Sequence, residues 1–156
     1  MITSIDHINI VVNNLDESIK FYTEVMGFKL SRRMILDGEW VEKIVGLDDV
    51  EAEVAFIELE SGPRIELLQY IQPEGESVDV NSFPNTKGLR HIAFNVDNMN
   101  EFVERLKANG IWFVNDPVLV PDHILPHSSH KKSLCYFFDP DRVLLELAAY
   151  ESDVDD

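Results

Sequence analysis

The sequence predicts an α+β protein in which one βαβββ module occurs twice. Two observations carry this prediction: a segment near the N-terminus recurs in the second half of the chain, and each copy runs from a β-rich stretch through a capped helix into three more β-rich stretches. With 156 residues, the chain has room for two small modules but hardly for two independent enzymes. The predicted boundaries are a first module at 1–71, a linker at 72–88, a second module at 89–150 and an acidic tail at 151–156.

The repeat is visible at both ends of each copy. Residues 5–17 align with residues 89–101 at an offset of 84, so that a histidine, an isoleucine, an asparagine and a glutamate recur in register. Further along, residues 64–70 align with residues 144–150 at an offset of 80, which matches a glutamate and a tyrosine. The second copy is therefore shorter internally than the first.

Each copy begins with a strand and a helix. Residues 5–12 and 89–96 are dominated by β-branched and aromatic residues, which are enriched in strands. Asn14 and Asn98 follow as predicted helix N-caps, each with a glutamate three positions later, which is the spacing of a capping box. Glycine can adopt the left-handed conformation that ends a helix. The glycines predicted to end the two helices are Gly27 and Gly110.

Three further strands are predicted to complete each copy. Turn-forming Gly, Pro and Asp residues separate the last two strands of each copy. The predicted strands are 28–36, 52–60 and 64–71 in the first copy, and 111–114, 133–138 and 143–150 in the second. The segment between the copies carries two prolines and two glycines among polar residues, and is therefore predicted to be a linker.

The charge balance limits the partners that the chain can bind. Its 13 Lys and Arg residues against 29 Asp and Glu residues give a formal net charge of −16. Because phosphate-binding surfaces need clustered basic residues, this balance argues against nucleic acid and against an anionic membrane surface. Part of the negative charge lies in the segment 151–156, which is predicted to be a solvated end.

Other features of the composition predict a cytoplasmic protein. The single cysteine, Cys135, cannot form an intrachain disulfide, and it lies in an apolar run where a small buried thiol is favoured over a nucleophile. No basic and then apolar signal peptide opens the sequence, and no apolar stretch approaches the roughly 18 residues needed to cross a bilayer.

Two histidines and two glutamates fall at matching positions of the repeat. His7 and His91 occupy the same point of the first strand, and Glu66 and Glu146 the same point of the last strand. A carboxylate in so apolar a strand needs a partner, because an unpaired buried charge is strongly unfavourable. One divalent metal ion could bind all four side chains. This ligand set suits Zn, Ni, Co, Mn or Fe and does not select among them.

Each of these residues has a simpler interpretation when taken alone. A single histidine in a strand is more often a core or surface residue, and a single glutamate in an apolar strand can pair with an arginine. The recurrence of both residue types at both equivalent positions is what favours a metal site.

At this point the sequence resembles the vicinal oxygen chelate superfamily, which includes glyoxalase I, methylmalonyl-CoA epimerase, extradiol dioxygenases, and fosfomycin- and bleomycin-resistance proteins. The resemblance runs from Ile5 to Tyr150, and the order and spacing of its motifs make it specific. These motifs are Asp6-His7-Ile8, the helix run 18–28, Arg90-His91-Ile92-Ala93-Phe94, and Phe138-Asp139-Pro140-Asp141 leading into 144–147. The chain departs from the family pattern at Arg142 and Val143, where members commonly have glycine and asparagine.

The resemblance implies two βαβββ modules that form incomplete barrels around a shared metal-binding cleft, with His7, Glu66, His91 and Glu146 facing one metal ion. The metal would chelate adjacent substrate oxygens and stabilise an enediolate or enolate, while Glu146 or Glu66 moves the proton. A homodimer is a further expectation at the level of the family.

The fourth ligand position favours one branch of the superfamily. The resemblance to extradiol dioxygenases would imply two histidines and one carboxylate as ligands, which would leave Glu66 free. A glutamate at this fourth position looks more like the glyoxalase and epimerase branch. The predicted function is a metal-dependent lyase or isomerase of the glyoxalase I (lactoylglutathione lyase) or methylmalonyl-CoA epimerase type. The alternatives are an extradiol dioxygenase acting on catechols, and a non-catalytic protein that binds a small molecule or confers resistance.

Substrate contacts are predicted beside the cleft. Asn9 and Asn95 lie on the faces of the first strands that carry the histidines. The segment 122–132 is predicted to be a loop bordering the cleft, where His130 and Lys131 could bind an anionic glutathione or CoA thioester. Its histidines could instead form a second metal site, although Pro126 argues against a helix that would align them. An exposed loop with no ligand role is the third interpretation. The histidines concerned are His123, His127 and His130.

Overall fold

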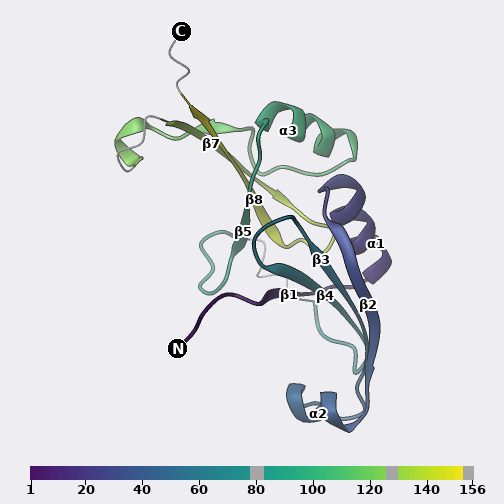
Figure 1. Cartoon of the computed structure of the whole chain (residues 1–156). Helices are drawn as coiled ribbons and strands as arrows, with labels where there is room; N and C mark the ends of the chain where they lie inside the picture. The colour runs from purple at the N-terminus through teal and green to yellow at the C-terminus, as the bar shows by residue number, and fades with distance from the viewer. Residues whose placement is uncertain (78–82, 126–129, 153–156) are drawn as a thin grey trace. The chain divides into compact units, whose positions relative to one another are not determined.

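The computed structural model describes residues 1–77, 83–125 and 130–152 of the chain (Figure 1). It consists of two compact units, Met1–Ser77 and Val78–Asp156, each built around its own four-stranded sheet. Both sheets are open and mixed, with one parallel and otherwise antiparallel pairings. The predicted α+β fold with two similar modules is therefore confirmed.

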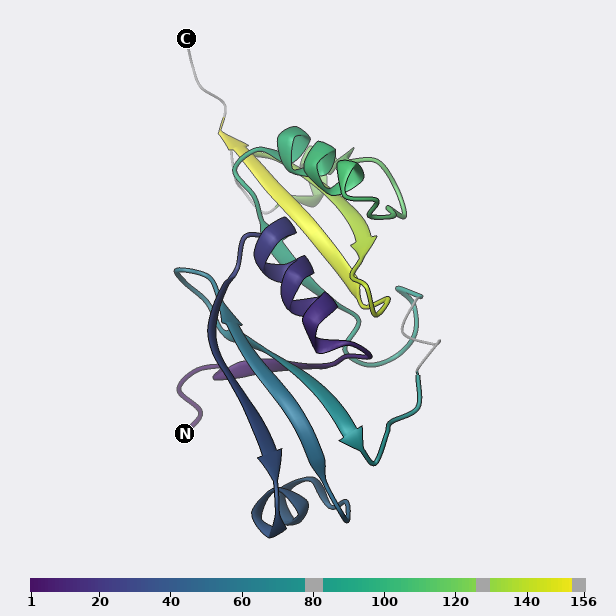
Figure 2. The ribbon, with the colours of Figure 1, turned by 90° about the vertical axis from the view of Figure 1, so that its right-hand side faces the viewer.

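In the first unit the strand order is β1-β4-β3-β2. β1 runs parallel to β4, whereas β3 pairs antiparallel with both of its neighbours. The elements are β1 (His7–Val11), α1 (Leu15–Lys20), a π-helical turn (Phe21–Val25), β2 (Lys29–Asp37), α2 (Glu39–Val45), β3 (Glu51–Glu58) and β4 (Arg64–Gln72). α1 packs against β3 and β4, and α2 lies in the connection between β2 and β3, where Figure 2 shows it at one end of the sheet.

The second unit repeats this arrangement with the order β5-β8-β7-β6. β5 is parallel to β8, as β1 is to β4, and α3 packs on β8. The elements are β5 (His91–Asn95), α3 (Met99–Ala108), β6 (Val118–Leu119), a 3-10 turn (Asp122–Ile124), β7 (His130–Phe138) and β8 (Leu144–Ser152). No helix in the described parts of either unit is long and apolar enough to cross a membrane.

The helix boundaries follow the predicted signals. The side chains of Asn14 and Asn98 accept hydrogen bonds of 3.1 Å from the backbone N–H groups three residues later, so both are N-caps. Gly27 and Gly110 follow the helices with positive φ angles of 87° and 75°, a conformation that favours glycine. The first helix changes to a π-helical turn at Phe21, which was not predicted from the sequence.

The α1 face of the first sheet forms the core of its unit. Alternate strand residues are buried there, among them Ile10, Ile65 and Leu67, and the helix contributes Leu15 and Tyr22. The second unit buries the corresponding side chains of β8, Leu145 and Leu147, together with Leu106 of α3. Because neighbouring strand residues point to alternate faces, Glu66 and Glu146 each lie on the face of their own sheet that does not carry the helix.

The structure differs from the predicted elements at three places. Residues 111–114 form only one isolated bridge, Phe113 to Phe137, and the edge strand is β6 instead. The helix α2, between β2 and β3, was not predicted. The acidic tail was predicted from residue 151, but β8 continues to Ser152, and residues 153–156 lie outside the described part of the chain.

The hairpin before β8 contains a residue with a positive φ angle. Arg142 adopts a left-handed conformation with φ of 65°. The buried Asp139 side chain holds the turn, because its Oδ1 accepts hydrogen bonds from the backbone N–H groups of Asp141 (2.9 Å) and Val143 (2.8 Å). These bonds fix the turn immediately before β8.

Removing the cap of α3 should weaken the second unit. Asn98→Ala is expected to lower the free energy of unfolding by about 1 kcal/mol, because the backbone N–H group of Glu101 loses its acceptor. Asn100→Ala, at an exposed position inside the same helix, is the matched control and should be neutral or slightly stabilising. Urea unfolding followed by circular dichroism measures both, and equal losses would contradict the capping role.

Candidate metal centre

In the first unit, His7 of β1 and Glu66 of β4 face one another. The His7 Nε2 atom lies 3.5 Å from Glu66 Oε2. The parallel register pairs Asn9 with Glu66, and Asn9 Nδ2 donates a 2.9 Å hydrogen bond to the same carboxylate oxygen. The glutamate side chain is 17% exposed and the histidine 39%, so the pair is open to a ligand.

The orientation of His7 is set by its preceding residue. His7 Nδ1 lies 2.8 Å from Asp6 Oδ2, and because an ionised carboxylate can only accept, Nδ1 carries the hydrogen. Arg64 also donates to Asp6 at 2.9 Å. The hydrogen bond from His7, followed by the interactions with Arg64, holds the pKa of Asp6 below its usual value. The Nε2 atom of His7 faces Glu66 and would be the metal-binding atom, as in metal-binding histidines that a carboxylate orients through the other ring nitrogen.

The second unit repeats the pair with His91 of β5 and Glu146 of β8. The His91 Nε2 to Glu146 Oε2 distance is again 3.5 Å. Here the glutamate side chain is only 10% exposed and the histidine 35%. Tyr136 of β7 lies directly across from Glu146, and its ring packs edge-on against His91 with 5.3 Å between ring centroids.

The Tyr136 hydroxyl interacts with the Glu146 carboxylate. Burial raises the pKa of Tyr136 above its usual value, and the negative charge of Glu146 and the hydrogen bond between the two side chains raise it further. The phenol therefore remains neutral around pH 7 and acts as a donor to the carboxylate.

Both pairs fit a divalent metal ion. Two ligands at about 2.1 Å from a tetrahedral ion are separated by roughly 3.4 Å, close to the histidine-to-glutamate distance in each unit. Imidazole nitrogen and carboxylate oxygen are both ligands for Zn and related metals. The described residues contain no group of three or more His, Cys, Asp or Glu side chains close enough to form a site by themselves. Each unit thus supplies half of the predicted ligand set.

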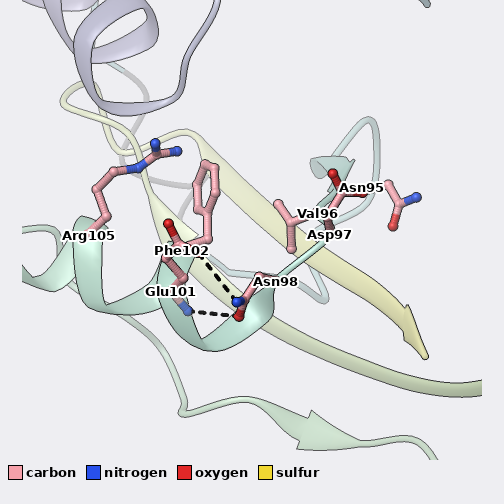
Figure 3. Close-up of a pocket in the computed structure, with 7 residues that line it drawn as sticks. All are labelled: Asn95, Val96, Asp97, Asn98, Glu101, Phe102 and Arg105. Atoms are coloured by element: carbon pink, nitrogen blue, oxygen red, sulfur yellow. Dashed lines mark hydrogen bonds between the residues drawn. The ribbon is translucent and has the colours of Figure 1, made fainter.

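The predicted substrate contacts fall in different places. Asn9 lies within the first pair, as described above. Asn95 lines a separate pocket of about 290 Å³ at the N-terminal end of α3, with Asn98, Phe102 and Arg105, and neither His91 nor Glu146 lines it (Figure 3).

The segment 122–132 is only partly described. His123 lies in the exposed 3-10 turn Asp122–Ile124, whereas His127 lies outside the described residues. His130 and Lys131 open β7 rather than lying in a loop. Strand alternation places Lys131 on the face of the sheet opposite Glu146, and Lys132, whose Nζ lies over the Tyr150 ring, on the same face as Glu146.

Cys135 is a buried structural thiol, as predicted. It is fully buried beside Met99, and burial is the main cause that raises its pKa to about 11. A thiol with this pKa is protonated at neutral pH and is a poor nucleophile.

Asp6 and Tyr136 are site residues that the sequence alone did not single out. Asp6 carried a detectable signal, because a carboxylate directly precedes the first predicted ligand. Tyr136 carried none, since its place across from Glu146 depends on the register between β7 and β8.

Comparison with known proteins agrees with this fold. Residues 4–147 match the Glyoxalase/Bleomycin resistance protein/Dioxygenase superfamily. The chain belongs to this superfamily. The matched range includes both histidines and both glutamates of the candidate centre.

Individual members of the superfamily are distant from this chain. A glyoxalase family protein from Bacillus cereus has a similar structure, with a TM-score of 0.82, 28% identity and 97% coverage of both chains. A 2-epi-5-epi-valiolone epimerase from Actinomyces is 26% identical over 76% of this chain and 66% of its own length. A lactoylglutathione lyase from Schizosaccharomyces pombe is 28% identical over 93% of this chain and 47% of its own. The chain thus spans two thirds or less of these two enzymes.

Proposed function

We propose that this chain is a metal-dependent lyase or isomerase in which His7, Glu66, His91 and Glu146 bind one divalent metal ion. The observation that carries the proposal is the second glutamate: Glu66 faces His7 at the same distance at which Glu146 faces His91. A site with two histidines and one carboxylate would not need this fourth side chain. The resemblance to the glyoxalase and epimerase branch is what implies a use for it.

The reaction that suits these residues is proton transfer at a carbon next to a carbonyl group. A bound divalent ion would supply a Lewis acid that polarises neighbouring substrate oxygens. Glu146, the less exposed of the two carboxylates, accepts the proton from carbon, and the electron pair of the broken C–H bond forms the enediolate or enolate. Return of the proton to the adjacent carbon would give the lyase product, whereas delivery of a proton to the opposite face of the same carbon would give the epimer and needs a second acid there, for which Glu66 is the candidate.

The proposed substrate is a small molecule with adjacent oxygen atoms, such as a glutathione or CoA thioester or its precursor. The names of the two enzyme relatives support both reaction types, since one is an epimerase and the other acts on a glutathione thioester. The sheet face around Glu66 offers an apolar surface for the remainder of the substrate. This surface consists of Met34, Leu36, Ala52, Val54, Phe56, Leu68 and Tyr70.

A metal and substrate survey tests the proposed function. The purified chain should bind one divalent ion, measured by elemental analysis after anaerobic purification. It should then turn over at least one of three substrates: the hemithioacetal of methylglyoxal and glutathione, methylmalonyl-CoA, or 2-epi-5-epi-valiolone. Oxygen uptake with catechols would instead identify a dioxygenase, and tight stoichiometric binding without turnover would identify a binding protein.

A further inference from the structure

The two proposed metal-binding glutamates have different hydrogen-bond partners, although the repeat relates them. In the first unit, the donor to Glu66 is the side-chain amide of Asn9, from the neighbouring parallel strand, at 2.9 Å. On the other side of Glu66 lies Phe56 of β3, which has no donor. Glu66 is therefore held by a neutral amide from β1.

In the second unit the residue with the hydrogen-bond donor lies on the other side of the glutamate. Ala93 of β5 takes the place across from Glu146 that Asn9 takes across from Glu66, and it has no donor. Tyr136 of β7 takes the place of Phe56, directly across from Glu146, and it carries a phenol hydroxyl that can donate to the carboxylate. Each carboxylate thus has a donor from a different side, and the two donors differ in chemistry.

The difference suits two separate tasks. Asn9 donates to the same Glu66 oxygen that faces His7 Nε2, so it fixes that oxygen where a metal ligand is needed. The Tyr136 ring lies across from Glu146 and is fixed by its contact with His91, so its hydroxyl can hold the Glu146 carboxylate in one orientation. Glu146 is also the more enclosed carboxylate, and enclosure strengthens the effect of a single hydrogen bond.

We infer that Tyr136 and Asn9 are positioning residues with different roles. Tyr136 orients Glu146 for proton transfer, and Asn9 holds Glu66 in place as a metal ligand. The inference rests on the proposed function. It predicts that loss of either donor changes a different measured quantity.

Two substitutions separate these roles, because each introduces the side chain that the repeat carries at the equivalent position of the other unit. Tyr136→Phe should lower kcat about 10- to 100-fold, the effect of one hydrogen bond to a charged group, with little change in KM or in Co²⁺ affinity. Asn9→Ala should weaken Co²⁺ binding about 10- to 100-fold, and excess metal should restore its turnover. Tyr150→Phe, which removes an exposed phenol hydroxyl elsewhere on β8, is the matched control.

The outcomes are distinct from those that test the reaction itself. If both variants lose Co²⁺ affinity equally, or if excess metal also restores the turnover of Tyr136→Phe, the inferred roles are wrong, and the proposed lyase or isomerase activity still stands. If the unmodified chain turns over none of the substrates, the proposed function fails. Calorimetric Co²⁺ titration of Asn9→Ala and Tyr136→Phe still decides the inference in that case, because only Asn9→Ala should bind the ion more weakly.

Discussion

Glu146→Gln should reduce turnover by about 10²- to 10⁴-fold, because the amide cannot accept the proton that the proposed reaction removes from carbon. The substitution keeps the size of the side chain and an oxygen that can receive the hydrogen bond from Tyr136, so the sheet should remain folded. The measurement is kcat at saturating metal on whichever lyase or epimerase substrate the chain accepts. Metal content is determined on the same samples.

The control must separate loss of the base from loss of charge. Glu39→Gln removes a carboxylate from the exposed surface of α2, where Glu39 pairs with Lys43 four residues later, and it should retain full turnover. If Glu146→Gln keeps both its metal and its turnover, Glu146 is not the base. Glu66 would then become the candidate for proton transfer.

The architecture could be predicted because the same local signals occur twice. Asn14 and Asn98 cap their helices, and the glycines that follow them have the left-handed conformation. Period-two alternation placed the histidines and glutamates on the faces away from the helices. These signals are local, and they require no knowledge of how distant strands pair.

The elements that escaped prediction depend on tertiary contacts. α2 has seven residues, begins after Gly38 without a side-chain cap, and exposes Trp40 and Ile44, so neither capping nor amphipathicity marks it. Residues 111–114 look like a strand, but after one bridge the side chain of Asn115 accepts from the backbone N–H group of Tyr136. A side chain thus replaces the backbone partner that would extend the ladder.

The same limit applies to the candidate centre. The types and positions of the four predicted ligands are readable from the repeat, and within each unit the histidine and glutamate do lie together. The residues that orient them are set by strand register, which a sequence of alternating residues specifies only through its turns. Asn9 was predicted as a substrate contact, and in the structure its side chain donates a hydrogen bond to Glu66, which the sequence did not predict.

His7→Ala and His91→Ala should each abolish high-affinity metal binding, because the proposed ion takes ligands from both units. Each variant should weaken binding by at least about 100-fold, the upper end of the loss seen when only an outer-shell partner is removed. The measurement is the number of Co²⁺ ions bound per chain, by elemental analysis and by the absorption of the bound ion. His123→Ala, in the exposed 3-10 turn, is the matched control and should bind one ion as before.

The stoichiometry distinguishes one shared ion from two separate ones. If each histidine and glutamate pair bound its own ion, the unmodified chain would hold two ions, and either variant would still hold one. A shared ion predicts one ion in the unmodified chain and none in either variant. The proposal of a shared ion rests on ligand number, since each pair supplies two protein ligands and zinc sites use three or four. Retention of one ion by either variant would therefore overturn the proposed centre.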